Sequence, residues 1–263
     1  MSTQNTNELD DPQRKSNRAF GSDSVARSVW YRAYDLRYEK ALVDRYFIQG
    51  RKVLDLGCGY GRTTVLLKQQ GYDVVGADIV ERMIAEARVA HPDIDYRVMD
   101  ACAIEFAEAT FDYVLFSFNG IDCILPESRR LQAMKEIFRV LKPGGTAILS
   151  SHNWLPYLLL PQYWKGGRFV SFLRDGVLAR RWYRAGVEEM PFDCYISTPL
   201  RTLRQLRAAG FDGLEVAAGQ HPMPWPFRKA GLLTVCIDLW PHFIARKKPA
   251  CRTTGWLGFG SPR

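Results

Sequence analysis

Short apolar runs alternate with helical patterns through residues 52–152, and this alternation constrains the fold more than any other feature of the chain. The apolar runs predict strands over 52–57, 72–79, 94–100, 111–118 and 146–152. Amphipathic patterns between them predict helices over 61–71, 81–91 and 126–145. Apolar strands that alternate with helices are typical of a mostly parallel sheet covered on both faces. The sequence therefore predicts a doubly wound α/β fold.

The ends of the chain and one internal segment depart from this rhythm. Residues 1–24 are polar and lack the apolar stretch of a signal peptide, so we expect a flexible N-terminal arm. Residues 25–250 are expected to form the main domain, and residues 251–263 a flexible tail. Within that domain, residues 153–197 are rich in aromatic side chains and have no strand-helix period. We interpret them as a lid inserted after the fifth strand.

Composition narrows the cellular setting and the partners. The six cysteines form no C-x-x-C pair, which argues against a zinc site and a disulfide scaffold. We therefore predict a reducing, cytoplasmic location and no metal. The net charge of +8 is concentrated in residues 165–184 and from Arg228 onward. Such charge fits an anionic partner or solvated helix faces, and because no nucleic-acid-binding motif accompanies it, we do not expect nucleic acid as the partner.

The stretch "VLDLGCGYGRTT", residues 53–64, ends a predicted buried strand with glycines at positions 57, 59 and 61. In an open parallel sheet, ligands bind beyond the carboxyl ends of the strands. Glycine lets the backbone approach a ligand, and the next helix offers free N–H groups. Dinucleotides and S-adenosylmethionine are both bound in this way. The dinucleotide pattern needs its third glycine at position 62, where this chain has Arg62.

Four further features follow the glycine loop in order. Asp78 ends the second strand, Asp100 and Ala101 follow the third, "FDYVLF" forms the fourth, and "VLKPGG" leads into the fifth. Together with the loop they resemble the ordered signature of the class I S-adenosylmethionine-dependent methyltransferases. The resemblance covers roughly residues 52–151. It implies a Rossmann-like methyltransferase fold, a methyltransferase activity and S-adenosylmethionine as the cofactor.

The resemblance also assigns individual residues to the cofactor. Each acid has a simpler role as well, since Asp55 can cap the turn and Asp100 can end a strand. The implied contacts are Gly57 and Gly59 beside the amino-acid part with Asp55 supporting the loop, Asp78 on the ribose, Ile79 on the adenine face, Asp100 and Ala101 at the adenine edge, and Phe118 or its neighbour Ser117 on the methionine side.

The methyl acceptor should bind beyond the fourth and fifth strands. Asn119 and Asn153 are predicted to contact it there, and Arg181 and Arg184 of the lid to hold an anionic group on it. His152 follows the fifth strand and is the candidate general base, although it could also only line the pocket.

The chain lacks the Asn/Asp-Pro-Pro-Tyr/Phe motif that such enzymes carry when they modify amino groups of DNA bases or glutamine amides. We therefore expect methyl transfer to an oxygen or nitrogen of a small molecule. Two alternatives stay open. One is a lipid or quinone-like acceptor met at a membrane surface, indicated by the apolar residues 154–161 beside basic charge. The other is a non-catalytic protein that binds S-adenosylmethionine. Peripheral membrane contact and homodimer formation also stay open.

Overall fold

The structure of the protein is a computed structural model. It describes residues 36–161, 182–185, 192–217 and 238–249, together with Gln13, Asn17, Arg18, Ser22 and Cys236. The predicted tail, nearly all of the predicted N-terminal arm and much of the predicted lid lie outside the described residues.

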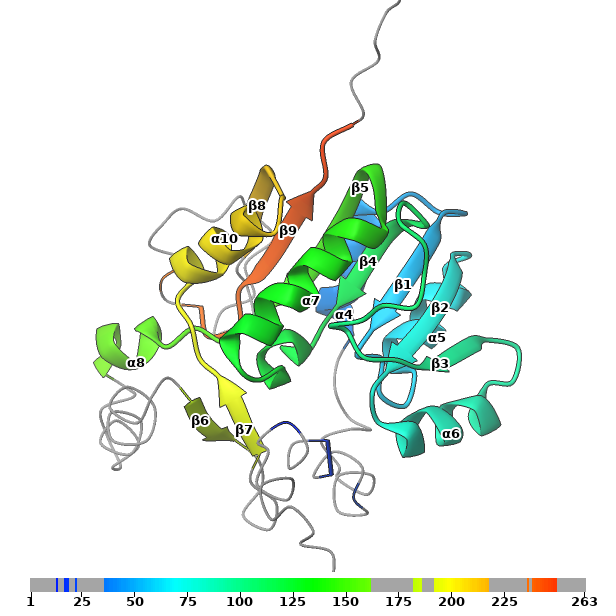
Figure 1. Ribbon diagram of the computed structural model, residues 1–263, viewed down its shortest axis with the longest axis horizontal. Helices are drawn as coiled ribbons and strands as arrows, with labels where there is room; N and C mark the ends of the chain where they lie inside the picture. Colours follow the sequence, from blue (N-terminus) through cyan, green and yellow to red (C-terminus); the bar gives the residue numbers. More distant parts are fainter. Residues whose placement is uncertain are drawn as a thin grey trace, which may run out of the picture.

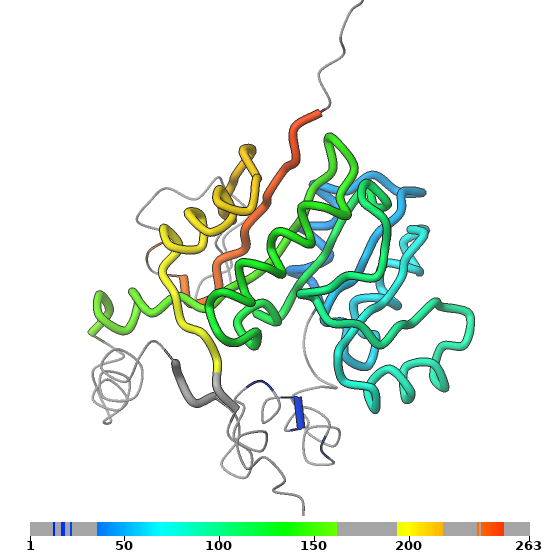
Figure 2. The backbone as a smooth tube through the Cα atoms, viewed as in Figure 1, coloured from blue at the N-terminus to red at the C-terminus, as the bar shows by residue number. Residues whose placement is uncertain are grey.

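A seven-stranded sheet with the order β3-β2-β1-β4-β5-β9-β8 forms the centre of the structure (Figure 1). Its strands are β1 (Lys52–Leu56), β2 (Asp73–Asp78), β3 (Asp95–Val98), β4 (Phe111–Phe116), β5 (Leu141–Ser150), β8 (Gly213–Ala217) and β9 (His242–Arg246). Strands β1 to β5 pair in parallel, whereas β9 runs antiparallel to both β5 and β8. Figure 2 shows β9, which is distant in sequence, beside β5.

Helices cover the two faces of this sheet and bury an apolar core on each. One face packs against α7 (Glu127–Val140) and α10 (Pro199–Ala208), which contribute Met134, Ile137 and Leu206 to its core. The other packs against α4 (Arg37–Tyr46), α5 (Arg62–Gln69) and α6 (Glu81–Ala90), which contribute Leu42, Leu67 and Ile84. The predicted doubly wound α/β fold is confirmed.

The fifth strand begins earlier than the sequence pattern indicates. Helix α7 ends at Val140, and Leu141 already pairs with Phe111, so "LKPGG" belongs to β5 and not to the preceding helix. A register shift then separates this pair from the next, Tyr113 with Thr146. Gly144 lies in the left-handed region with φ +82°, which explains why a turn-like sequence can sit inside a strand.

The segment after β5 contains short elements in its described parts. These are α8 (Leu155–Leu159) and the antiparallel hairpin of β6 (Trp182–Ala185) and β7 (Phe192–Tyr195). A bridge between Asn153 and Ser197 joins the start of the segment to its end. Strand β9 is antiparallel to β5, so the arrowhead of β9 in Figure 1 marks the amino end of the parallel strands. Figure 1 shows the hairpin beyond the other end of the sheet, where the parallel strands have their carboxyl ends. A lid over this edge stays a prediction.

Strand β1 lies between β2 and β4, and this is the switch point where ligands bind in doubly wound folds. The glycine loop leaves β1 here with φ +67° at Gly57. A Cβ at this position would lie 2.5 Å from Cε2 of Phe116, the last residue of β4. Phe116 is 3% exposed, so its ring has little room to move away. The backbone of the glycine loop therefore packs directly on the end of β4.

Gly57→Ala should destabilise the protein by about 2–5 kcal/mol, because it adds core overpacking to the cost of a left-handed alanine. Gly71→Ala is the matched control. Gly71 has φ +82°, and a Cβ added there would meet nothing within 4 Å, so only the backbone cost of about 1–2 kcal/mol applies. Urea unfolding of both variants measures the difference. Equal destabilisation of the two variants would mean that the Phe116 ring moves aside at little cost, and would contradict close packing of the loop on β4.

Candidate active site

The glycine loop is tied to the end of β2 through Asp78. The backbone N–H groups of Gly59 and Val80 donate to its two carboxylate oxygens, each over 2.9 Å. Burial raises the pKa of Asp78, while these N–H groups act to lower it. Asp78 is the last residue of β2, as predicted, and Ile79 beside it is 37% exposed. The loop and the predicted ribose carboxylate therefore form one site.

Asp55 lies beneath this loop and is 1% exposed. The hydroxyls of Thr63 and Thr64, in the first turn of α5, both donate to its Oδ2 over 2.6 Å. Its Oδ1 is buried and has no hydrogen-bond partner. Burial raises the pKa of Asp55 to about 6, against the lowering effect of the two hydroxyls. Asp55 thus joins the end of β1 to the first turn of α5, and its role toward the cofactor stays a prediction.

The loop after β4 has an unusual backbone. Phe118 and Asn119 both have φ 55°, a left-handed conformation that is rare for residues other than glycine and unfavourable for a large aromatic residue. The guanidinium of Arg62, at the start of α5, lies 3.7 Å from the centre of the Phe118 ring, and this contact offsets part of the cost. Ser117 is buried just before this turn. Backbone strain of this kind is concentrated at functional sites.

Asp100 follows β3 in the same edge of the sheet. It accepts a hydrogen bond from the backbone N–H of Cys102 over 2.8 Å, and it pairs with Arg129 of α7 over 2.5 Å. Ala101 is half-buried beside it. Asp100 is held in place by groups of the chain, so its role at the adenine edge stays a prediction.

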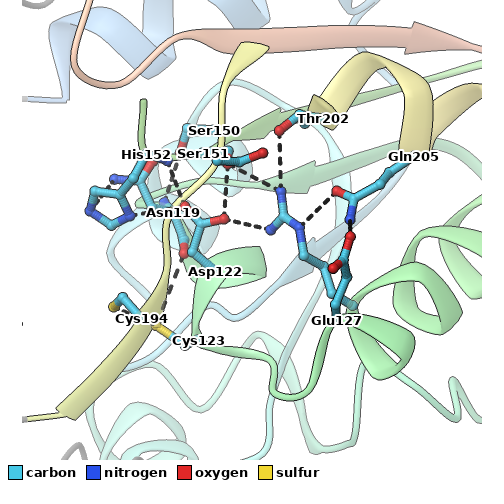
Figure 3. A network of polar contacts seen from close by, with 12 residues as sticks. Asn119, Asp122, Cys123, Glu127, Ser150, Ser151, His152, Cys194, Thr202 and Gln205 are labelled. Atoms are coloured by element: carbon cyan, nitrogen blue, oxygen red, sulfur yellow. Dashed lines mark hydrogen bonds and ion pairs between the residues drawn. The ribbon is translucent and has the colours of Figure 1, made fainter. Parts of the chain in front are cut away.

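His152 follows β5 and contacts a buried carboxylate (Figure 3). Its Nδ1 lies 2.9 Å from Oδ2 of Asp122, which also accepts the backbone N–H of His152 over 2.6 Å. Asp122 lies in the 3-10 turn η2 (Gly120–Cys123) and is fully buried, whereas the side chain of His152 is 27% exposed. With Nδ1–H donating to Asp122, Nε2 carries the free electron pair of the ring. A buried acid therefore fixes the orientation of the His152 ring, and the role of His152 as a base stays a prediction.

The other predicted acceptor residues have different surroundings. The side-chain nitrogen of Asn119 lies 3.4 Å from Nε2 of His152. Asn153 is 2% exposed and donates to the backbone carbonyls of Cys236 and Asp238, so its amide nitrogen is already used within the fold. Arg181 lies outside the described residues, and Arg184 is in β6 but its side chain is not described. The structure thus brings Asn119 to the predicted base.

The structure reveals a residue that the sequence reasoning missed. Arg130 of α7 is fully buried and pairs with Oδ1 of Asp122 over 2.5 Å. The signal was present, because residues 130, 134 and 137 fall on one helical face and the other two are apolar. An arginine on the apolar face of a helix predicts a buried partner.

These residues fit S-adenosylmethionine better than a dinucleotide. Dinucleotides place their pyrophosphate at the start of the helix that follows the glycine loop. Here the carboxylate of Asp55 lies beneath that point, bonded to the first turn of the helix, and opposes a phosphate there, whereas Asp78 suits the ribose hydroxyls of either cofactor. No cluster of His, Cys, Asp or Glu within the described residues could hold a metal ion.

Fold and site together define a doubly wound protein in which the glycine loop after β1 lies beside the loop after β4. A family model described as "Methyltransferase domain" matches residues 53–145. With the ordered signature, this match supports a class I S-adenosylmethionine-dependent methyltransferase domain over residues 53–145, with S-adenosylmethionine as its cofactor.

Curated relatives that match the chain are named methyltransferases, and solved structures share its fold. A demethylmenaquinone methyltransferase of Beutenbergia cavernae is 33% identical over 111 residues, which cover 41% of this chain and 45% of the relative. The chain thus spans about half the length of that relative. A ubiquinone biosynthesis O-methyltransferase of Roseobacter denitrificans is 29% identical over 81% of this chain and 79% of its own length. The fold is similar to that of an S-adenosylmethionine-dependent methyltransferase from Thermotoga maritima, with a TM-score of 0.63, 19% identity and coverage of 89% and 100%.

The raised pKa of Asp55 predicts a pH-dependent cost to stability. Because its pKa rises from 3.8 to about 6 on folding, its favourable contribution is complete below pH 4 and is lost as the pH rises through 6. Asp55→Asn removes this loss. The free energy of unfolding of the variant minus that of the wild type should therefore increase by about 3 kcal/mol from pH 4 to pH 7. Denaturant unfolding without added cofactor measures it.

The same substitution at the exposed Asp93 is the control and should keep the pH profile of the wild type. A constant difference between Asp55→Asn and the wild type across this pH range would contradict the prediction.

Proposed function

We propose that this protein transfers a methyl group from S-adenosylmethionine to a hydroxyl oxygen on the ring of a small aromatic acceptor, with His152 as the general base. When bound, the cofactor supplies a methyl group on a positively charged sulfur and leaves as S-adenosylhomocysteine. Asp55, Asp78 and the glycine loop hold it, and the residues after β4 and β5 receive the acceptor. The contact between His152 and Asp122 is the observation that carries the proposal.

The proposed step needs a base because a hydroxyl is a poor nucleophile while it keeps its proton. Nε2 of His152 removes the hydroxyl proton as the acceptor oxygen bonds to the methyl carbon and the carbon–sulfur bond breaks. The imidazolium that forms is stabilised by the carboxylate of Asp122, which holds Nδ1–H over 2.9 Å. The amide nitrogen of Asn119 lies 3.4 Å from the same Nε2, so the acceptor hydroxyl has to displace this contact before Nε2 takes the proton.

A base favours some acceptors over others. A thiolate, a carboxylate or an unprotonated amine already has a free electron pair and gains little from His152, whereas a ring hydroxyl gains most. Trp240 lies edge-on to His152 with ring centres 6.4 Å apart, which suits an aromatic neighbour. The name of one relative, a ubiquinone biosynthesis O-methyltransferase, supports transfer to an oxygen, and the name demethylmenaquinone methyltransferase supports a quinone-like ring.

Access from a membrane surface remains the second candidate for the acceptor. The apolar residues Leu158 and Leu159 of α8 are 44% and 49% exposed, which favours contact with an apolar phase. Among the residues that the structure describes, no helix has both the length and the apolar character needed to cross a membrane. Pelleting with vesicles at low and moderate salt tests surface contact. If the protein stays in the supernatant at both salt concentrations, an acceptor taken from solution is favoured.

Asp78→Asn should weaken the binding of S-adenosylhomocysteine roughly ten- to a hundredfold, because hydrogen bonds to a charged acceptor contribute about 1.5–3 kcal/mol. Asp73→Asn is the control, since Asp73 is an exposed residue at the opposite end of the same strand. Calorimetry with S-adenosylhomocysteine, and with NAD for comparison, measures the affinities. An Asp78→Asn protein that binds like the wild type would exclude Asp78 as a cofactor ligand.

His152→Gln should lower kcat about 10²- to 10⁴-fold and leave the affinity for S-adenosylhomocysteine unchanged, because glutamine keeps a polar amide but cannot take the proton. Methyl-labelled S-adenosylmethionine is incubated with a short-chain naphthoquinol, a catechol and an aromatic amine, and the labelled product is identified. His91→Gln, at the end of α6, is the control.

Label on the hydroxylated rings alone is the expected result. Transfer to the amine alone, or full activity of His152→Gln, would contradict the proposed function.

A further inference from the structure

Arg130 is the largest fully buried side chain among the described residues. A buried ion pair is weak support for stability, because apolar residues of similar volume often stabilise a core as well or better. The position of Arg130 on the apolar face of α7 therefore calls for another reason than stability.

The guanidinium of Arg130 joins several elements at one point. Its Nη1 donates to Asp122 in η2, its Nη2 to the hydroxyls of Ser151 and Thr202 over 3.1 and 3.5 Å, and its Nε to Gln205 over 3.1 Å. Its Cζ lies 4.9 Å from the centre of the Tyr195 ring in β7. The contacts thus come from η2, the end of β5, α10 and β7. A planar fork of donors can serve them together, and a single ammonium group cannot.

Gln205 in turn is held from outside this cluster. Its amide nitrogen donates to Glu127 over 3.0 Å, and Glu127 pairs with Arg201 of α10 over 2.6 Å. Figure 3 shows Gln205 and Glu127 on one side of the cluster and His152 on the other, with Asp122 between them. The position of Arg130 is therefore fixed by α7 and α10, which are the two helices packed on this face of the sheet.

Asp122 transmits this constraint to the base. Its Oδ1 accepts from Arg130 and from the hydroxyl of Ser151, and its Oδ2 accepts from the backbone and the ring of His152. Four donors thus surround one buried carboxylate, and the carboxylate cannot rotate without losing several of these bonds at once. The ring of His152 is held by the oxygen that faces away from Arg130.

From this arrangement we infer that Arg130 is a positioning residue for the proposed methyl transfer, which acts through Asp122 to hold His152 with Nδ1–H on the carboxylate and Nε2 toward the acceptor. The inference rests on the proposed function. Its first readout is nevertheless structural, so that failure of the inference and failure of the proposed function are distinguishable.

The first test measures the tautomer of His152 in the full chain with S-adenosylhomocysteine bound. The chain has four histidines, so ¹⁵N-histidine NMR resolves them, and His152→Gln assigns the signal. The wild type should show the Nδ1–H form. Arg130→Lys keeps the charge but loses the fork, and should give a mixture of both forms. Arg139→Lys, on the same helix and paired with Glu136, is the matched control and should keep the wild-type spectrum.

The second test compares kinetics. Arg130→Lys should lower kcat about ten- to a hundredfold through a misplaced base, with little change in the KM for S-adenosylmethionine. In the Asp122→Asn background, replacing Arg130 by Met should cause no further loss of kcat. Arg130 is inferred to act on His152 only through the Asp122 carboxylate, which this background lacks. A further loss of tenfold or more would overturn the inference, and so would a wild-type His152 spectrum in Arg130→Lys.

If Arg130→Lys does not fold, as judged by loss of S-adenosylhomocysteine binding, Gln205→Met replaces it. This variant loosens Arg130 without removing a charge and should shift the His152 tautomer in the same direction. An unchanged tautomer in Gln205→Met would also overturn the inference. A shifted tautomer in a protein that methylates no acceptor would support the role of Arg130 and contradict the proposed function alone.

Discussion

The pairing of β1 with β4 decides where the chemistry of this protein can occur. The two strands run in parallel, with Val53 opposite Tyr113 and Asp55 opposite Leu115, so the loops that follow them leave the sheet side by side. One loop is rich in glycine and the other contains two left-handed residues that are not glycine. Phe116 packs between them, close to Gly57 and to Gly120. The cofactor loop and the turn that carries Asp122 therefore share one support.

The alternation of strands and helices predicts the fold because strands covered on both faces must be apolar throughout, and helices covered on one face must be periodic. That regularity gives the first five strands and their helices. It does not give the antiparallel pairing of β9 with β5, which is set by long-range contacts. The early start of β5 is also set by pairing, since Leu141 joins Phe111 before the Pro-Gly-Gly turn.

The positions of the residues predicted to bind the cofactor follow from the sequence, whereas the surroundings of the predicted base do not. The cofactor residues follow strand ends in a fixed order, so Asp55, Gly59 and Asp78 can be located by counting. The partner of His152 depends on the left-handed backbone of Phe118 and Asn119, which residue preferences disfavour. The burial of Asp122 was therefore not predictable, although Arg130 on an apolar helix face was a signal that some buried acid must exist.

Two consecutive arginines of α7 connect the two sides of the site. Arg129 pairs with Asp100 at the end of β3, and Arg130 pairs with Asp122 in the turn after β4. Successive residues of a helix point about 100° apart, so one helical turn reaches both the predicted adenine edge and the acid that holds the proposed base. A shift of α7 would move both carboxylates together. The packing of α7 on the sheet thus couples the predicted adenine edge to the proposed base, and methyl transfer would need this relative placement from a protein that supplies mainly position.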